Sequence, residues 1–267
     1  MLKLRVVTAA IGVPVVILAV WFGTPWFSFL IAAAALVGTL EFYRIANFEK
    51  REPLLYFGLL WTLSLVLSPL YKSTNILPVV MSIAILISLT LLLFRTPRDN
   101  AFHKWAWTIA GAIFVGWMLS YWISLRGLDN GRDWVYLAML TIFANDTGAF
   151  FIGRAKGKHK LVPAISPAKT WEGAIGGLVS SISGAIIIVV ILNLISPFTF
   201  EYWQIILLGF LISFFAQIGD LVESLLKRNM GVKESGTLLP GHGGILDRFD
   251  SIIFVGPAVY YFVIGVV

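Results

Sequence analysis

The residues best suited to chemistry lie near the end of the chain, between Ser224 and Asp250. This stretch carries four Lys or Arg residues, three acidic residues and several glycines between two apolar segments. Charge beside lipid costs about 2.5–3.5 kcal/mol per charged residue at a helix centre, so it indicates a functional site. Carboxylate oxygens could hold a hard metal ion, and the cations could bind phosphate groups.

Two sets of polar residues recur at intervals of three and four, which places each set on one face of a helix end. The first set is Asp220, Glu223, Ser224 and Lys227, and the second is Asp247, Asp250 and Ser251. Carboxylates presented by two helices at one depth predict a Mg²⁺ site, because Mg²⁺ commonly bridges protein carboxylates and substrate phosphates. The alternative is a structural ion-pair network, Asp247 with Arg248 or Asp220 with Lys227.

A glycine-rich segment joins the two sets and would let the backbone come close to a ligand. Its glycines are Gly231, Gly236, Gly241, Gly243 and Gly244. His242 lies among them, and either hydrogen-bonds a phosphate or base or only locks the turn. The spacing fits neither a Walker loop nor a GxGxxG motif.

The order of these residues resembles the signature of the phosphatidate cytidylyltransferases, the CDP-diacylglycerol synthases. That pattern is S-x-x-K-R-x-x-x-x-K-D-x-G followed by P-G-H-G-G-x-x-D-R-x-D. The matching positions are Ser224, Lys227, Arg228, Lys233, Gly236, Pro240, Gly241, His242, Gly243, Gly244, Asp247, Arg248 and Asp250. Glu234 stands where the family usually has Asp, which changes the geometry at that position but not the charge.

A second segment, residues 166–173, resembles the family motif S-P-K-K-T-x-E-G. Ser166 and Pro167 are typical of the N-cap and first position of a helix, whose exposed N–H groups suit phosphate. Lys169 would then lie in the first turn, where a cation opposes the helix dipole, so we expect an anion between them. Ala168 replaces the usual Lys, which could weaken triphosphate binding or catalysis while leaving the fold unchanged.

A third polar site, residues 145–147, interrupts an apolar run, and a basic cluster follows it from Arg154 to Lys160. A metal-bound polyphosphate would satisfy both the Asp146 carboxylate and the cations. Alternatively, Asp146 pairs with Arg154 or Lys156, and the cluster contacts anionic lipid headgroups.

The composition places these sites in a polytopic membrane protein. Hydrophobic residues make up 58% of the chain and charged residues 13%, with a mean hydropathy of +0.88. We predict an all-α fold with about nine transmembrane helices. The spans are expected at Val6–Phe22, Trp26–Ala46, Leu54–Leu70, Leu77–Phe94, Trp105–Leu125, Trp134–Phe151, Gly173–Ile195, Tyr202–Leu226 and Ser251–Val267. The absence of cysteine excludes disulfides, thiolate zinc sites and a cysteine nucleophile.

The basic residues predict the orientation of these spans. One side of the membrane would hold Lys3, Arg5, Arg44, Lys50, Arg51, Arg95, Arg98, Lys104, Arg154, Lys156, Lys158, Lys160, Lys169, Lys227, Arg228, Lys233 and Arg248. The other side would hold only Lys72, Arg126 and Arg132. The positive-inside rule then puts the N-terminus in the cytoplasm and the C-terminus outside. We expect the first span to be retained, because no small-x-small cleavage site follows it.

The first half of the chain carries little that could do chemistry. Glu41 is the exception, and we expect it to form a structural ion pair with Arg44 three residues later. We therefore divide the chain into N-terminal transmembrane helices over residues 1–125 and a C-terminal part, residues 126–267, that carries the site.

The resemblance implies a transferase of phospholipid biosynthesis that passes CMP from CTP to phosphatidate, giving CDP-diacylglycerol and pyrophosphate. The lipid phosphate is then the nucleophile, so the protein need only position the reactants and neutralise charge. The resemblance also implies Mg²⁺ as the cofactor and gives no reason to expect a nucleic-acid partner. A second, monovalent cation and a homodimer stay open. The site would lie at the cytoplasmic side of the cell (inner) membrane, open to CTP and to phosphatidate in the lipid.

The expected roles fall into three groups. The metal ligands are Asp220 and Asp247, with Asp250 and Asp146 in support. The catalytic residues are Asp220, Asp247, Lys227, Arg228 and Arg248. The substrate-binding residues are Asp146, Ser166, Lys169, Thr170, Ser224, Lys233, Gly241, His242, Gly243 and Gly244.

Two other functions stay open. A cation-coupled transporter would also carry intramembrane carboxylates, but near the midplane and in matched halves, whereas here they cluster in one half of the chain. A membrane transferase with a polyprenyl phosphate acceptor would use similar metal chemistry and would differ in its products.

Overall fold

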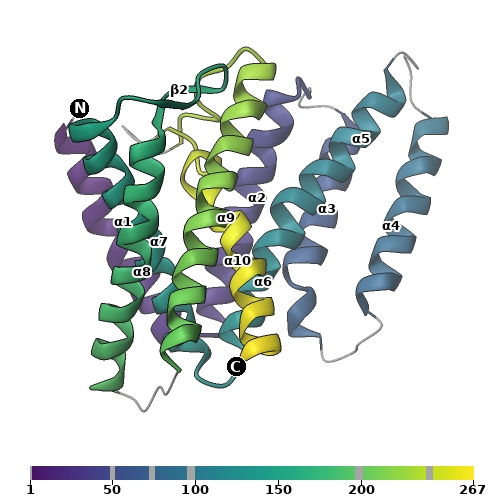
Figure 1. Cartoon of the computed structure of the whole chain (residues 1–267). Helices are drawn as coiled ribbons and strands as arrows, with labels where there is room; N and C mark the ends of the chain where they lie inside the picture. Colours follow the sequence, from purple (N-terminus) through teal and green to yellow (C-terminus); the bar gives the residue numbers. More distant parts are fainter. Residues whose placement is uncertain (1, 49–51, 72–75, 95–99, 196–200, 239–242) are drawn as a thin grey trace. The chain divides into compact units, whose positions relative to one another are not determined.

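The computed structural model describes residues 2–48, 52–71, 76–94, 100–195, 201–238 and 243–267, with the backbone alone at residues 2–7 and 9. Over these residues the regular elements are helices and one short hairpin (Figure 1). The long helices are α1 (Leu2–Phe22), α2 (Trp26–Ile45), α3 (Pro53–Val66), α4 (Ile76–Leu93), α7 (Gly131–Lys156), α8 (Trp171–Asn193), α9 (Tyr202–Asn229) and α10 (Leu246–Val266). The shorter elements are η1 (Ser68–Leu70), α5 (Ala101–Gly111), η2 (Ala112–Trp117), α6 (Met118–Arg126), β1 (Lys160–Val162) and β2 (Ser166–Thr170).

The helices confirm the predicted polytopic membrane fold. Within the described residues, 8 helices are long and apolar enough to cross a membrane, and a shorter apolar helix covers Ala10–Phe22. Segment η2 is π-helical and joins α5 to α6 in one span over Ala101–Arg126. Helices α7 and α10 extend beyond the predicted apolar runs, because hydropathy marks only the lipid-facing part of a helix whose backbone bonds continue into polar sequence.

The orientation of the helices across the membrane stays a prediction. Part of the charge count behind it also rests on cations outside the described residues. These are Lys50, Arg51, Lys72, Arg95 and Arg98.

The chain divides into two compact units. Unit 1 comprises Met1–Ser124 and Val232–Phe249, and unit 2 comprises Leu125–Gly231 and Asp250–Val267. One boundary falls inside α10, so the first turn of this helix belongs to unit 1 and the rest to unit 2.

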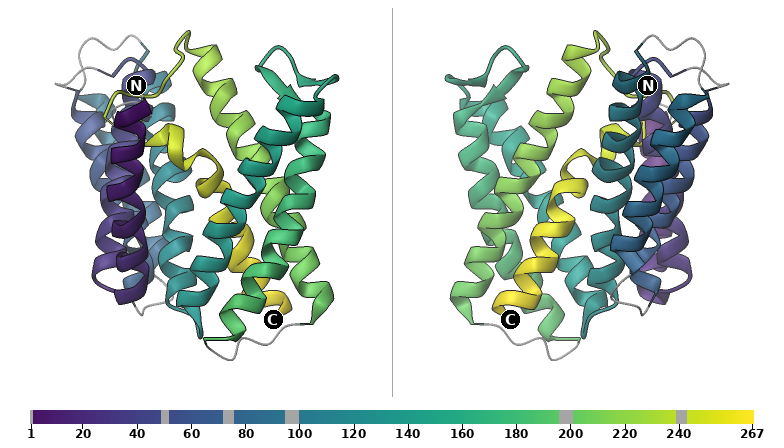
Figure 2. Two further views of the ribbon diagram at one scale, coloured as in Figure 1. Left: turned by 90° about the vertical axis from the view of Figure 1, so that its left-hand side faces the viewer. Right: turned by 90° about the vertical axis from the view of Figure 1, so that its right-hand side faces the viewer.

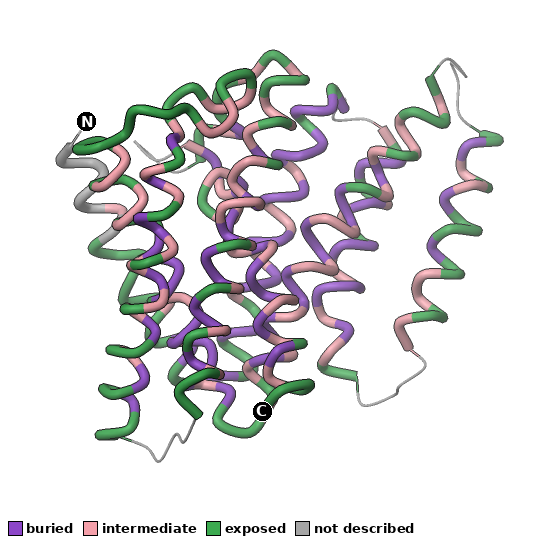
Figure 3. The backbone as a smooth tube through the Cα atoms, viewed as in Figure 1, coloured by how far each residue is buried: buried purple, intermediate pink, exposed green. Residues whose placement is uncertain are grey.

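Unit 1 is built around α2, whose aromatic residues form much of its interior. Tyr43 is fully buried, donates its hydroxyl hydrogen bond to the carbonyl oxygen of Thr108 at 2.7 Å and stacks on Phe48. Most residues of α4 are exposed or half-buried (Figure 3), including large apolar ones such as Leu86. Exposed apolar side chains on a helix of this length are typical of a surface that faces lipid.

Unit 2 is built from α7, α8 and α9, with the hairpin of β1 and β2 joining α7 to α8 at one end of the two helices (Figure 2). The strands pair antiparallel, with Lys160 opposite Thr170 and Val162 opposite Ser166. A carboxylate anchors this hairpin, because Glu172 accepts hydrogen bonds from the backbone nitrogens of Lys158 and His159 at 3.1 and 3.2 Å.

The hairpin corrects the predicted start of α8. Ser166 is not an N-cap and Lys169 is not in a helical first turn, because both lie in β2. The cap is Thr170, whose hydroxyl accepts a hydrogen bond from the backbone nitrogen of Gly173 at 3.1 Å, and the helix begins at Trp171. The extended backbone of β-branched Thr170 suits both the end of a strand and an N-cap.

Candidate active site

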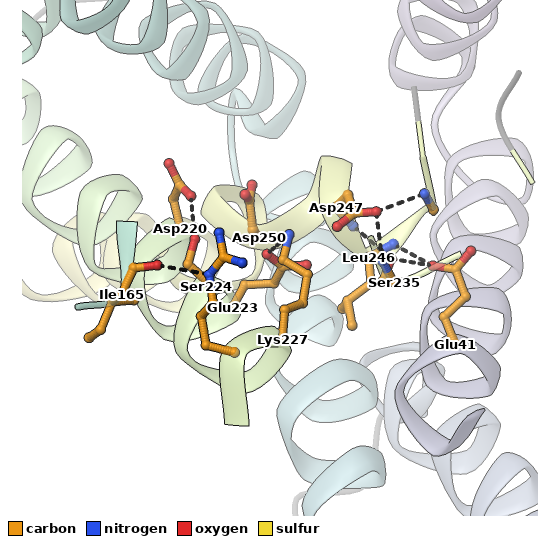
Figure 4. A network of polar contacts seen from close by, with 12 residues as sticks. Glu41, Ile165, Asp220, Glu223, Ser224, Lys227, Ser235, Leu246, Asp247 and Asp250 are labelled. Atoms are coloured by element: carbon orange, nitrogen blue, oxygen red, sulfur yellow. Dashed lines mark hydrogen bonds and ion pairs between the residues drawn. The ribbon is translucent and has the colours of Figure 1, made fainter. Parts of the chain in front are cut away.

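In unit 1, the carboxylate of Asp247 is held by two backbone N–H groups. Its Oδ2 accepts hydrogen bonds from the nitrogens of Ser235 and Gly244 at 2.9 and 2.8 Å (Figure 4). Gly243 has a φ of +82°, a left-handed conformation that favours glycine, and a Cβ there would lie 2.7 Å from the same oxygen. The turn before α10 is therefore shaped around Asp247.

Glu41 also contacts this turn, which corrects the expected pair with Arg44. The Glu41 carboxylate is buried and accepts hydrogen bonds from Ser235 Oγ at 3.1 Å and from the nitrogens of Ile245 and Leu246 at 3.1 and 2.8 Å. Arg44 is exposed. The first N–H groups of a helix have no intrahelical acceptor, so the start of α10 offers a buried carboxylate better partners than an exposed guanidinium.

The other motif residues of unit 1 lie towards its surface. Lys233, Glu234 and Arg248 are exposed, so their charged groups are accessible to a ligand. Gly241 and His242 lie outside the described residues, and their predicted roles stay predictions.

In unit 2, α9 carries a polar face near its C-terminal end. Asp220 Oδ2 forms an ion pair with Lys169 Nζ at 2.8 Å, and its Oδ1 accepts a hydrogen bond from Ser224 Oγ at 3.4 Å. One turn further on, Glu223 pairs with Lys227. The anion opposite Lys169 is thus a carboxylate of α9, whereas the sequence predicted an anion at a helix N-terminus.

Close packing of α10 against α9 brings Asp250 to this polar face. A Cβ at Gly219 would lie 2.4 Å from the carbonyl oxygen of Asp250, and Ser251 Oγ donates a hydrogen bond to Ala216 O at 3.2 Å. Unit 2 therefore carries predicted site carboxylates on three helices, Asp146 on α7, Asp220 on α9 and Asp250 on α10.

Cations of α9 and of the segment that follows α7 also lie in unit 2. Arg228 donates from Nε to the carbonyl oxygen of Ile165 at 3.3 Å, which links the end of α9 to the hairpin turn (Figure 4). The basic cluster that follows α7 is exposed at Arg154, Lys156 and Lys158. This end of unit 2 therefore presents positive charge close to acidic oxygens.

A buried amide positions Asp146. Asn145 Nδ2 donates a hydrogen bond to Asp146 Oδ1 at 3.0 Å, while Asn145 Oδ1 accepts one from Ser213 Oγ at 2.7 Å. Gln217 Nε2 donates to the same Ser213 hydroxyl at 2.9 Å. This chain of hydrogen bonds links the carboxylate on α7 to the interior of α9.

The carboxylates do not form a complete metal cage by themselves. Among the described residues, no three His, Cys, Asp or Glu side chains come together closely enough to hold a metal ion. The donor set nevertheless fits Mg²⁺, which commonly takes one or two protein carboxylates together with waters and substrate phosphates.

Three structural residues were missed or misassigned from the sequence. Glu41 and Asn145 are buried polar groups within apolar runs, and that isolation was the available signal. Glu172, whose carboxylate anchors the hairpin, gave no signal beyond its place in the second motif.

The helices define a polytopic membrane protein, and the comparisons with known proteins specify the family. The model of the cytidylyltransferase family matches residues 3–265. The chain is 36% identical over 266 residues to a phosphatidate cytidylyltransferase from Bacillus subtilis, which covers 97% of each protein. It is 34% identical over 260 residues to one from Staphylococcus haemolyticus, with 96% of each covered. The chain belongs to the cytidylyltransferase family.

Proposed function

We propose that the chain makes CDP-diacylglycerol and pyrophosphate from CTP and phosphatidate. Family membership over nearly the whole length is the observation that carries this conclusion. The reaction needs no nucleophile from the protein, because a phosphate oxygen of phosphatidate attacks the α-phosphorus of CTP and pyrophosphate leaves. The two rival functions, a transporter and a polyprenyl phosphate transferase, fit neither the family nor its full-length relatives.

The cations are proposed to bind the phosphate groups. Lys169 and Lys227 each pair with a carboxylate of α9, which holds their ammonium groups beside the acidic cluster. Arg228, Lys233 and Arg248 are exposed and could reach phosphate groups outside the protein. Together these five residues would offset the charge of the triphosphate, of the leaving pyrophosphate and of the lipid headgroup.

Asp220, Asp247 and Asp250 are proposed to hold Mg²⁺, with Asp146 in support. Asp247 and Asp250 are one helical turn apart on α10, so both project from one helix face. When bound, the ion would neutralise phosphate charge and orient the leaving group. The protein's part is to fix the carboxylates, as the backbone bonds to Asp247 do.

The site is proposed to open at the cytoplasmic face, where CTP is available and where the charge asymmetry of the loops puts these residues. A homodimer and a second, monovalent cation remain predictions from the family resemblance. Substrate binding by Ser166, Thr170, Ser224 and the glycine turn likewise remains a prediction.

Single Asp→Asn replacements test the metal assignment. Asp220→Asn and Asp247→Asn are expected to abolish CDP-lipid formation in protein that still elutes as a folded species. The matched control is Asp129→Asn, which changes an exposed carboxylate in the turn before α7 and should leave turnover unchanged. Wild-type-like turnover by both site variants would overturn the assignment.

A further inference from the structure

We propose that Glu41, on α2 in the N-terminal half, is a positioning residue for the catalytic turn before α10. Its buried carboxylate holds Ser235, Ile245 and Leu246 in the conformation that orients Asp247. This inference rests on the proposed metal-binding role of Asp247, and the experiments below separate the two.

Glu41 is buried and is hydrogen-bonded to the turn before α10 at three atoms. Glu41 is 2% exposed, and its carboxylate accepts hydrogen bonds from one hydroxyl and two backbone nitrogens. The two nitrogens belong to Ile245 and Leu246, at the start of α10, where N–H groups point out of the helix and a negative charge is favoured by the dipole. A residue about 200 positions earlier in the chain thus caps the helix that carries Asp247.

Ser235 links the two carboxylates. Its hydroxyl donates to Glu41 Oε2 at 3.1 Å and accepts from the backbone nitrogen of Asp247 at 3.3 Å. Its own backbone nitrogen donates to Asp247 Oδ2 at 2.9 Å. Displacement of Glu41 would therefore release Ser235 and, through it, both the backbone and the side chain of Asp247.

Glu41 also accounts for two glycines of the turn. A Cβ at Gly236 would lie 2.4 Å from Glu41 Oε1 and 2.8 Å from Glu41 Cδ. A Cβ at Gly244 would lie 2.4 Å from Glu41 Oε2 and 2.1 Å from Ser235 Oγ. Neither glycine has a positive φ. Close contacts with Glu41, joined at Gly244 by Ser235, and not backbone strain, leave no room for a Cβ at these two positions unless those side chains shift.

Glu41→Gln is the first test, because it keeps the shape of the side chain and removes the charge. Groups that orient a metal ligand typically change metal affinity or activity by about 10- to 100-fold when replaced. We expect the Mg²⁺ concentration for half-maximal activity to rise by about that factor, with a smaller change in the KM for CTP. The matched control is Thr39→Val, two residues away on α2, where a buried hydroxyl bonds Thr62; it should leave the Mg²⁺ requirement unchanged.

Hydrogen exchange tests whether Glu41 holds the turn before α10, without any assay of activity. In Glu41→Gln, the backbone amides of residues 244–247 should exchange faster than in wild type, while those in the middle of α2 keep their protection. An unchanged exchange rate in residues 244–247 would overturn the proposal.

A double-mutant cycle provides a test that does not depend on Glu41→Gln being stable. In Gly236→Ala, the three atoms nearest to the added methyl group all belong to Glu41 and lie 2.4–3.1 Å away. The methyl group should therefore displace the Glu41 carboxylate, and we expect the Mg²⁺ concentration for half-maximal activity to rise at least about tenfold. Because Glu41→Ala removes all three of those atoms, adding Gly236→Ala to it should change the Mg²⁺ requirement by less than about twofold. Additive effects of the two changes would contradict the proposal.

Asp247→Asn separates this inference from the proposed function. If Asp247→Asn keeps the wild-type Mg²⁺ dependence, the metal-binding role of Asp247 fails, whatever the exchange data show. A second outcome is that Asp247→Asn is inactive while Glu41→Gln keeps the wild-type amide exchange rates and Mg²⁺ requirement. The positioning role of Glu41 then fails, and the metal-binding role of Asp247 stands.

Discussion

A methyl group at Gly219 should disable the enzyme without unfolding it. In the structure, a Cβ at this position would lie 2.4 Å from the carbonyl oxygen of Asp250, whereas ordinary contacts begin at 3.4 Å. The backbone of α10 must therefore move away from α9 by about 1 Å, the difference between these distances. Asp250 would move with it, away from Asp220.

Gly219→Ala should affect stability in two opposite ways, through helix propensity and through packing, and should affect the rate separately. Alanine favours a helix interior over glycine by about 0.8–1 kcal/mol, which would offset part of the cost of the displaced packing. A displacement of about 1 Å at a catalytic site can cost on the order of 100-fold in rate, or about 2.7 kcal/mol of transition-state stabilisation. We therefore expect turnover to fall on the order of 100-fold, while the free energy of unfolding changes much less than the transition-state stabilisation does.

The assay is CDP-lipid formation at saturating CTP, together with the melting temperature in detergent. Gly265→Ala is the matched control, because it lies on α10 and its added Cβ would meet nothing within 4 Å. Turnover of Gly219→Ala within about twofold of the control would show that activity does not require α9 and α10 to approach this closely at Asp250.

Three further predictions concern the segment before α8. Lys169→Met removes the ammonium group that pairs with Asp220, and we expect turnover to fall about 100-fold in steady-state assays; an unchanged rate would exclude a phosphate contact. Ala168→Lys adds a cation to this exposed strand and should lower the KM for CTP, whereas an unchanged KM would show that position 168 is remote from the triphosphate. Thr170→Val removes the N-cap bond to Gly173 and should cost about 1 kcal/mol, read as a lower melting temperature; Thr170→Ser should restore it.

The membrane fold could be predicted from the sequence because lipid leaves the chain few options. A spanning segment must satisfy its own backbone and expose apolar side chains, so each apolar run became a helix. The helix ends were less accurate. At Ser166, the local Ser-Pro signal favours a helix start, but pairing of β1 with β2 and the bonds from Lys158 and His159 to Glu172 extend the backbone instead.

The contacts among the candidate site residues were predictable where these residues are close together in sequence. The polar face of α9 follows from helical spacing alone, and the structure pairs Asp220 with Ser224 and Glu223 with Lys227. The partners of Lys169 and Glu41 were not predictable, because each is a carboxylate or an N–H group brought close by tertiary packing. The hydrogen bond from Leu246 to Glu41 was the hardest to predict, because the two residues are 205 positions apart in the sequence.

The proposed reaction is tested most directly with purified protein in detergent, CTP and phosphatidate. We expect equal amounts of CDP-lipid and pyrophosphate, formed only when Mg²⁺ is present and abolished by Asp247→Asn. Formation of both products at the same rate in the presence of a chelator would contradict the metal assignment. Failure of folded protein, including Ala168→Lys, to form a CDP-lipid under any of these conditions would contradict the proposed reaction.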